Sequence, residues 1–141
     1  MNILVTGKNG QLGSEIQYLA PQYPSFNFIY TDVAELDITD ASLVAAFFEQ
    51  NKIDMVINCA AYTAVDQAED DSEVANKVNN IAVKNLVEAC LQHNAKIIHI
   101  STDYVFDGSN HVPYVETDAV SPIGVYGKTK HLGEEQVLQT A

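Results

Sequence analysis

Short apolar runs alternate with stretches of helical periodicity along this chain of 141 residues. Four of the runs predict buried strands, at 3–5, 26–30, 55–57 and 97–100. Apolar residues at helical spacing predict helices over 12–19, 43–48 and 74–90 and from 126 onward. Parallel strands need a connection long enough to return across the sheet, and each of these helices supplies one. The alternation therefore predicts a doubly wound parallel α/β sheet.

Local signals indicate where the predicted helices begin and end. Pro21 closes the first helix, and Asp40 is placed to cap the second. The second helix carries an apolar stripe made of Leu43, Val44, Phe47 and Phe48. The third helix is predicted to run for about six turns, with one apolar face made of Val74, Val78, Ala82, Leu86 and Cys90.

Three glycines follow the first predicted strand and open the first helix. Gly7 permits a tight turn, Gly10 lets a pyrophosphate approach the backbone, and Gly13 allows the helix to pack closely on the strand. The helix N-terminus then offers free N–H groups and the positive end of its dipole to an anion. This context predicts a Rossmann-like dinucleotide site, and the alternative is an ordinary turn without a ligand.

The cofactor is predicted from a carboxylate, Asp32, nineteen residues after Gly13 at the end of the second strand. At about twenty residues an acidic side chain meets the adenosine ribose hydroxyls of NAD. Asp32 would repel the 2′-phosphate of NADPH, whereas Lys8 in the glycine turn would offset that repulsion. We expect NADH or NADPH, with NADH favoured. The alternative for Asp32 is a solvated loop carboxylate.

Tyr126 and Lys130 stand one helical turn apart and therefore share a face of the last predicted helix. A carbonyl reduction needs a proton donor, and a nearby cation lowers the pKa of a tyrosine from about 10 toward neutrality. Ser101 and Thr102 follow the fourth strand, at the edge where open α/β sheets bind ligands. The alternative is a partly exposed aromatic ring beside a snorkelling lysine.

Charge and cysteine content exclude several classes of function. Seven Lys and Arg residues against 19 Asp and Glu give a net charge of -12, so neither nucleic acid nor an anionic membrane is an expected partner. Cys59 and Cys90 form no disulfide framework, and the four histidines lack metal-ligand spacing, so no metal is expected.

His99 is predicted to be a hydrogen-bonded core residue. The acidic run 69–71 is predicted to be the first turn of the third helix. The absence of a signal-like segment or a membrane-length apolar run favours the cytoplasm.

Long stretches of the chain resemble the extended short-chain dehydrogenases/reductases, and among them the dTDP-4-dehydrorhamnose reductases. The resemblance rests on 58–66, 101–108 and 114–118, and it continues through Pro122 to Tyr126 and Lys130. It implies that the full-length protein uses NADH or NADPH to reduce dTDP-4-dehydro-L-rhamnose to dTDP-L-rhamnose, in dTDP-rhamnose biosynthesis.

The same resemblance implies a role for each matching residue. Tyr126 would be the proton donor, Lys130 its activator and Thr102 the hydroxyl that tunes its pKa. The sugar of the substrate would contact Thr102 and Asp103. Asn79 matches a helix asparagine that shapes the site in the wider superfamily, and its alternative is a surface amide. The cofactor would be held by Tyr126 and Lys130 together with Gly7, Gly10, Gln11, Leu12, Gly13, Asp32, Asp37, Ile38, Ala61, Tyr62 and Thr63.

Members of this family are much longer. The resemblance therefore implies that residues 1–141 are a truncated NAD(P)-binding domain, inactive by itself, that lacks the C-terminal sugar-nucleotide domain. The chain has no arginine, in agreement with a missing diphosphate clamp. An unpaired strand edge at 97–100 favours self-association, with a homodimer as the candidate assembly. Two alternatives remain open: a regulatory subunit resembling the methionine adenosyltransferase β subunit, and another sugar-nucleotide reductase or epimerase.

Overall fold

Four parallel strands organise the chain in the computed structural model, which describes residues 1–139. They are β1 (Asn2–Thr6), β2 (Asn27–Thr31), β3 (Met55–Asn58) and β4 (Lys96–His99). Their spatial order is β2-β1-β3-β4, so the direction of winding reverses between β1 and β3. Open α/β sheets bind ligands at such a reversal, beyond the carboxyl ends of the strands. The predicted doubly wound, Rossmann-like sheet is confirmed.

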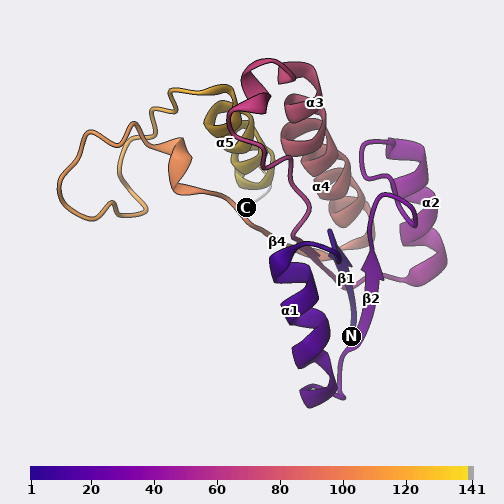
Figure 1. Cartoon of the computed structure of the whole chain (residues 1–141). Coiled ribbons are helices and arrows are strands. Elements are labelled where there is room, and N and C mark those ends of the chain that lie inside the picture. Colours follow the sequence, from indigo (N-terminus) through magenta and orange to yellow (C-terminus); the bar gives the residue numbers. More distant parts are fainter. Residues whose placement is uncertain (140–141) are drawn as a thin grey trace.

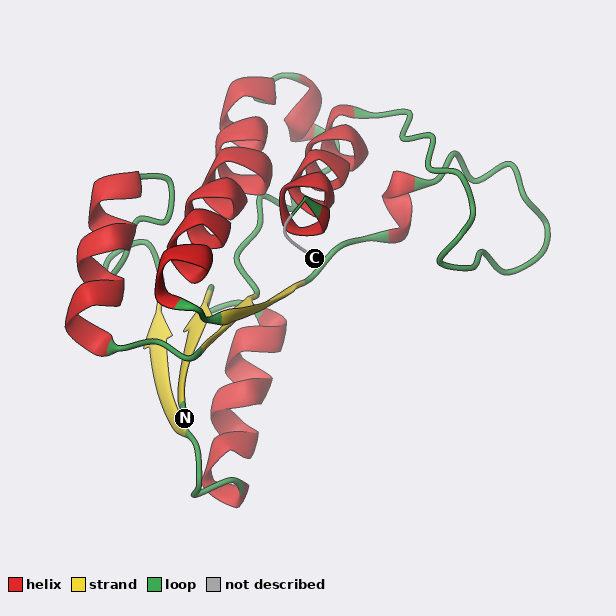
Figure 2. Cartoon of the chain, turned by 180° about the vertical axis from the view of Figure 1, so that it is seen from behind, coloured by secondary structure: helices red, strands yellow, loops and turns green. Residues whose placement is uncertain are grey.

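Helices connect the strands and cover both faces of the sheet unequally. They are α1 (Gln11–Leu19), α2 (Ala41–Asn51), α3 (Ser72–Asn76), α4 (Ala82–His93) and α5 (Val125–Leu138). Shorter turns are η1 (Ala20–Gln22), η2 (Gln67–Glu69) and η4 (Asp103–Val105), and the π-helical segment η3 (Lys77–Ile81) joins α3 to α4. In Figures 1 and 2, α1 lies by itself on one side of the sheet, opposite α2, α4 and α5. Within residues 1–139, no helix is both long enough and apolar enough to span a bilayer.

The main hydrophobic core lies between the sheet and the helices α2 and α4. Leu4 of β1, Val56 of β3, Phe48 of α2 and Leu86 of α4 are completely buried in it. Burying one such side chain contributes about 1.5–3 kcal/mol. Asp40 caps α2 as predicted, because its carboxylate accepts hydrogen bonds from two first-turn N–H groups.

The apolar stripe of α1 is less buried than its spacing predicts. Ile16 is half-buried, but Leu12 and Leu19 are 42% and 43% exposed. The reason is that α1 has this face of the sheet to itself in the described part of the chain (Figure 1). Ile98 of the edge strand β4 is similarly 47% exposed.

The long third helix is confirmed in extent, but one part of its predicted face is wrong. Helical structure runs from Ser72 to His93 through α3, η3 and α4. Ala82, Leu86 and Cys90 are buried as predicted, whereas Val74 is 50% exposed. A π turn holds more residues than an α turn, so η3 rotates the faces of α3 and α4 relative to each other.

The prediction for the acidic run 69–71 is also wrong. Glu69 ends η2, and α3 begins only at Ser72, so the run precedes the helix. The physical reason lies in its side chains, two of which accept hydrogen bonds from other elements. Asp71 accepts from the Tyr62 hydroxyl, and Glu69 accepts from the backbone of Val125.

Candidate active site

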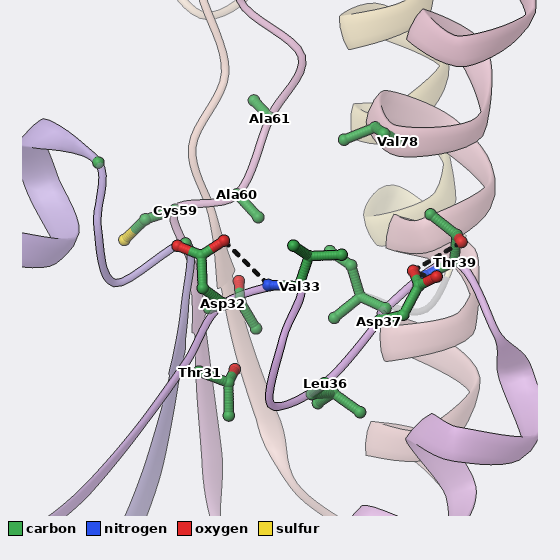
Figure 3. Close-up of a pocket in the computed structure, with 14 residues that line it drawn as sticks. Thr31, Asp32, Val33, Leu36, Asp37, Thr39, Cys59, Ala60, Ala61 and Val78 are labelled. Atoms are coloured by element: carbon green, nitrogen blue, oxygen red, sulfur yellow. Dashed lines mark hydrogen bonds between the residues drawn. The ribbon is translucent and has the colours of Figure 1, made fainter.

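A cavity of about 270 Å³ lies beyond the carboxyl ends of β1, β2 and β3, at the reversal of the strand order. Figure 3 shows side chains from the end of β2, the loop that follows it and the loop after β3 around this cavity. Six residues predicted to bind the cofactor line it together: Gly7, Gly10, Asp32, Asp37, Ile38 and Ala61.

The glycine turn forms one wall and allows unusually close backbone contacts. Gly7 has a φ of +65°, and a Cβ at this position would lie only 2.7 Å from the nitrogen of Ala60. A Cβ on Gly13 would overlap the carbonyl of Gly7. Gly10 is the N-cap residue of α1, and N–H groups in the first turn of a helix have no intrahelical partner. The turn can therefore present its backbone to an anion.

Asp32 ties the end of β2 to the glycine turn. One carboxylate oxygen accepts from the nitrogen of Asn9 at 3.2 Å and the other from the nitrogen of Val33 at 2.9 Å. Lys8 forms an ion pair with Glu35, and its Nζ lies 2.6 Å from Oε1 of that residue. This hydrogen bond lowers the pKa of Glu35. The sequence interpretation missed Glu35, and its spacing of three residues from Asp32 was the available signal.

The loop after β2 is held in place by side-chain hydrogen bonds. The Asp37 carboxylate accepts from both the nitrogen and the hydroxyl of Thr39, and these hydrogen bonds lower the pKa of Asp37 (Figure 3). The carbonyl of Ile38 accepts from the side chain of Asn85 at 3.0 Å. Two of the predicted cofactor residues thus lie in one ordered loop.

A polar row crosses the sheet beneath the cavity, made of Thr6, Asn58 and His99 in one register. Asn58 Oδ1 accepts from the Thr6 hydroxyl at 2.6 Å and from the nitrogen of Ala60 at 3.2 Å. Its Nδ2 therefore donates to Nδ1 of His99, at 3.0 Å. The predicted hydrogen bonding of His99 is confirmed. The sequence interpretation missed Asn58, although an asparagine ending an apolar strand was a usable signal.

His99 gives the fold a defined pH dependence. Burial, with a smaller contribution from Lys130, lowers the pKa of His99 to about 4, although Glu134 acts in the opposite direction. An unfolded histidine titrates near 6.5. As the pH falls from 6.5 to about 4, the unfolded chain binds a proton that the folded chain does not. We expect this group to lower the free energy of unfolding progressively through that window.

Urea denaturation at several pH values between 4.5 and 7 measures this effect. His99→Gln, which keeps an acceptor for Asn58 and cannot titrate, should show a shallower decline than the wild type. His111→Gln, a change of an exposed loop histidine, is the matched control. Identical declines for wild type and His99→Gln would contradict the assignment.

Tyr126 and Lys130 are both buried, with exposed fractions of 9% and 2%. Nζ of Lys130 donates to the carbonyl of Ile100, just beyond β4, at 2.5 Å. Burial lowers the pKa of Lys130 to about 8. The ring of Tyr126 meets that of Tyr104 edge-on, with centroids 5.4 Å apart. The alternative of an exposed ring beside a snorkelling lysine is therefore wrong.

Thr102 and Asp103 lie where β4 gives way to η4. The Thr102 hydroxyl donates to Asp103 at 3.2 Å and accepts from the nitrogen of Tyr104 at 3.3 Å. Both residues line a hollow of about 800 Å³ that also borders His99. Asp103 additionally lines a neighbouring hollow with Tyr126. The end of β4 and the start of α5 therefore border the same hollow.

Several predicted cofactor residues lie outside the first cavity. Gln11 and Leu12 are exposed on the first turn of α1, and Thr63 is exposed after Ala61. The Tyr62 hydroxyl donates to Asp71 at 3.0 Å, which raises the pKa of Tyr62 further than desolvation alone does. Tyr126 and Lys130 are likewise absent from the lining of that cavity.

Asn79 is a buried structural link, so its alternative as a surface amide is wrong. It lies in η3 with an exposed fraction of 1%. Its amide accepts from the nitrogen of Tyr62 and donates to the carbonyl of Tyr62 and the hydroxyl of Thr129. The loop after β3 is thereby joined to α5. Within the described part of the chain, no cluster of three or more potential ligands could hold a metal ion.

Comparison with known proteins identifies the family. Residues 1–141 match the family model described as the RmlD substrate binding domain. The chain belongs to the RmlD family. Its RmlD-type fold is shared by a crystal structure of a dTDP-4-dehydrorhamnose reductase from Clostridium acetobutylicum. That protein has 49% sequence identity and a TM-score of 0.95, with 99% of this chain and 49% of that chain covered.

Two further relatives of this RmlD-family chain are informative. A dTDP-4-dehydrorhamnose reductase of Aggregatibacter actinomycetemcomitans is 43% identical over 136 residues, which cover 96% of this chain and 46% of the relative. The crystal structure of the Bacillus anthracis reductase in complex with NADP is 38% identical, with a TM-score of 0.93 and coverage of 98% and 49%. The chain thus spans about half the length of the relatives that it matches.

Proposed function

We propose that the full-length protein is a dTDP-4-dehydrorhamnose reductase, which reduces dTDP-4-dehydro-L-rhamnose to dTDP-L-rhamnose with NADH or NADPH. The observation that carries this proposal is the buried Tyr126–Lys130 pair of α5, whose lysine is held at the carboxyl end of β4 by its bond to Ile100. The reductases with 38–49% identity support the choice of substrate.

The lining of the cavity at the strand reversal suits the adenosine and pyrophosphate part of a dinucleotide. Gly7 and Gly10 leave the backbone open to a pyrophosphate, and Asp32 at the edge of the cavity can accept hydrogen bonds from ribose hydroxyls. The cofactor supplies a hydride to the carbonyl carbon when it is bound. We propose residues 1–141 as the NAD(P)-binding domain, with Gln11, Leu12 and Gly13 at the pyrophosphate and Ala61, Tyr62 and Thr63 near the nicotinamide.

In this proposal Tyr126 donates a proton to the carbonyl oxygen of the substrate, because hydride addition leaves negative charge there. Lys130, with its pKa of about 8, is still mostly protonated at pH 7, so it favours the tyrosinate that forms. Thr102 and Asp103 contact the sugar from the end of β4.

The protein acts in the cytoplasm, in keeping with its free thiols Cys59 and Cys90.

Turnover by the full-length protein tests this function directly. Oxidation of NADH or NADPH should depend on dTDP-4-dehydro-L-rhamnose, and the product should be dTDP-L-rhamnose. The same assay with a 4-keto sugar linked to UDP measures selectivity for the nucleotide. A protein that binds NADPH but leaves the dTDP-sugar unreduced would have a different function.

The proposed ribose contact predicts a change in cofactor preference. Asp32→Ala removes both the hydrogen-bond acceptor for the ribose and the charge that repels a 2′-phosphate. We expect the ratio of the Kd values for NADH and NADPH to rise about tenfold in favour of NADPH, the equivalent of about 1.4 kcal/mol. Fluorescence titration with both cofactors measures the ratio. Glu15→Ala removes the same charge from the exposed face of α1 and is the control. An unchanged ratio in Asp32→Ala would show that Asp32 does not reach the ribose.

A further inference from the structure

We propose that Glu69 is a positioning residue for Tyr126: through the backbone of Val125 it holds the first turn of α5 where proton transfer requires it. The inference rests on the proposed function, and it names a residue that contacts neither cofactor nor substrate in that proposal.

The first observation is a hydrogen bond between distant parts of the chain. The N–H of Val125, the first residue of α5, donates to Oε1 of Glu69 at 2.8 Å across 56 residues. First-turn N–H groups need a partner from outside their own helix. The N-cap residue Gly124 has no side chain to supply one. A carboxylate suits this place, because it also faces the positive end of the helix dipole.

The second observation is that Gly124 leaves room for this carboxylate. A Cβ built on Gly124 would lie 2.9 Å from Oε1 of Glu69. That distance is too short for a carbon and an oxygen that are not bonded. Glycine at the N-cap position therefore removes a local cap and simultaneously admits the remote one.

The third observation is that η2 contacts Tyr126 through a second residue. Ala68 precedes Glu69 in η2, is completely buried and shares a small apolar cluster with Tyr126. Val125 and Val65 pack against the same cluster. One short turn thus packs against the ring of Tyr126 and binds the N–H of the residue before it.

Tyr126 and Lys130 therefore have different anchors. Lys130 is fixed to the end of β4 by its bond to Ile100, whereas the turn that carries Tyr126 is fixed to η2 by Glu69. Loss of Glu69 frees the tyrosine end of α5 and leaves the lysine end attached. The distance between donor and activator then varies, and a displacement of about 1 Å can cost up to about 10²-fold in rate.

The experiment compares three variants of the full-length protein. Glu69→Ala removes the acceptor, Glu69→Gln keeps an acceptor oxygen, and Asp70→Ala removes a neighbouring exposed carboxylate. Within residues 1–139, the side chain of Asp70 makes no hydrogen bond, so it is a matched control for charge. For each variant, kcat, KM for the dTDP-sugar, Kd for NADPH and the pH profile of kcat are measured, with active sites counted by cofactor titration.

We expect Glu69→Ala to lower kcat about tenfold with Kd for NADPH changed less than about twofold. The alkaline limb of its pH profile should shift, because the distance between Tyr126 and Lys130 is no longer fixed. Glu69→Gln should recover most of kcat, and Asp70→Ala should match the wild type. Amide hydrogen exchange at Val125 and Tyr126 should accelerate in Glu69→Ala but not in Asp70→Ala.

Unchanged kcat and unchanged amide exchange in Glu69→Ala would overturn the inference. Equal losses in Glu69→Ala and Asp70→Ala would also overturn it, because net charge alone would then explain the effect. A wild-type protein without turnover would refute the proposed function instead. In that case, exchange at Val125 still decides whether Glu69 holds the start of α5.

Discussion

Tyr126→Phe in the full-length protein is expected to lower kcat by at least about 10²-fold. The change removes the hydroxyl that donates the proton and keeps the ring that packs in the apolar cluster with Ala68. The fold and the affinity for NADPH should therefore persist. Steady-state oxidation of NADPH with dTDP-4-dehydro-L-rhamnose, together with fluorescence titration of NADPH, measures both quantities.

Tyr104→Phe is the matched control for this variant. Tyr104 meets the ring of Tyr126 edge-on, so its substitution removes a neighbouring phenol and preserves the aromatic contact. Its turnover should stay within about threefold of the wild type, well below the 10²-fold loss of the proton donor. Near-normal turnover in Tyr126→Phe would refute the role of Tyr126 as the proton donor.

Gly7→Ala is expected to abolish detectable NADH binding and to destabilise the fold by about 2–4 kcal/mol. An alanine would have to adopt the positive φ of +65°, and its Cβ would lie 2.7–2.9 Å from backbone atoms of Cys59 and Ala60. Relief of that overlap moves the turn away from β3 and deforms the cavity at the reversal of the strand order. Urea denaturation and calorimetric titration with NADH measure the two effects.

Gly108→Ala separates backbone strain from overlap. Gly108 has a similar φ of +71°, but no heavy atom would lie within 4 Å of its Cβ. Gly108→Ala should lower the free energy of unfolding only by the strain of an alanine with positive φ, about 1 kcal/mol. It should still bind NADH. If the two variants lost equal stability, the contact between the glycine turn and the loop after β3 would be unimportant.

Periodicity predicted the bounds of the four strands to within about one residue and those of the helices to within about three, because it reports which side chains must leave water. The Asp40 cap was predicted from its residue type, because a capping side chain binds N–H groups only two or three residues away. The glycine turn, Asp32, Asp37, Ile38 and Ala61 were predicted by motif or resemblance, and most of these residues line one cavity.

Contacts between distant residues were not predictable in this way. Asn58, Glu35 and Glu69 act through partners on other elements, so the local signals at Asn58 and Glu35 could mark a polar position but could not identify the residue that each one binds. The exposure of Leu12 and Leu19 was missed because helical spacing does not show whether a second layer covers the stripe.

The π-helical segment η3 makes two lengths of one helix independent in their orientation. Each residue of an α-helix turns the chain by about 100°, so one additional residue in η3 resets which side of α3 faces its neighbours α5 and η2 without moving α4. Asn79 can therefore point at the loop after β3 while Ala82 and Leu86 keep their places in the core. Removal of a single residue between positions 77 and 81 would produce a more regular helix and simultaneously misalign Asn79 with the loop that it holds. For this segment, chain length matters as much as residue identity, and substitutions should be tolerated more readily than insertions or deletions.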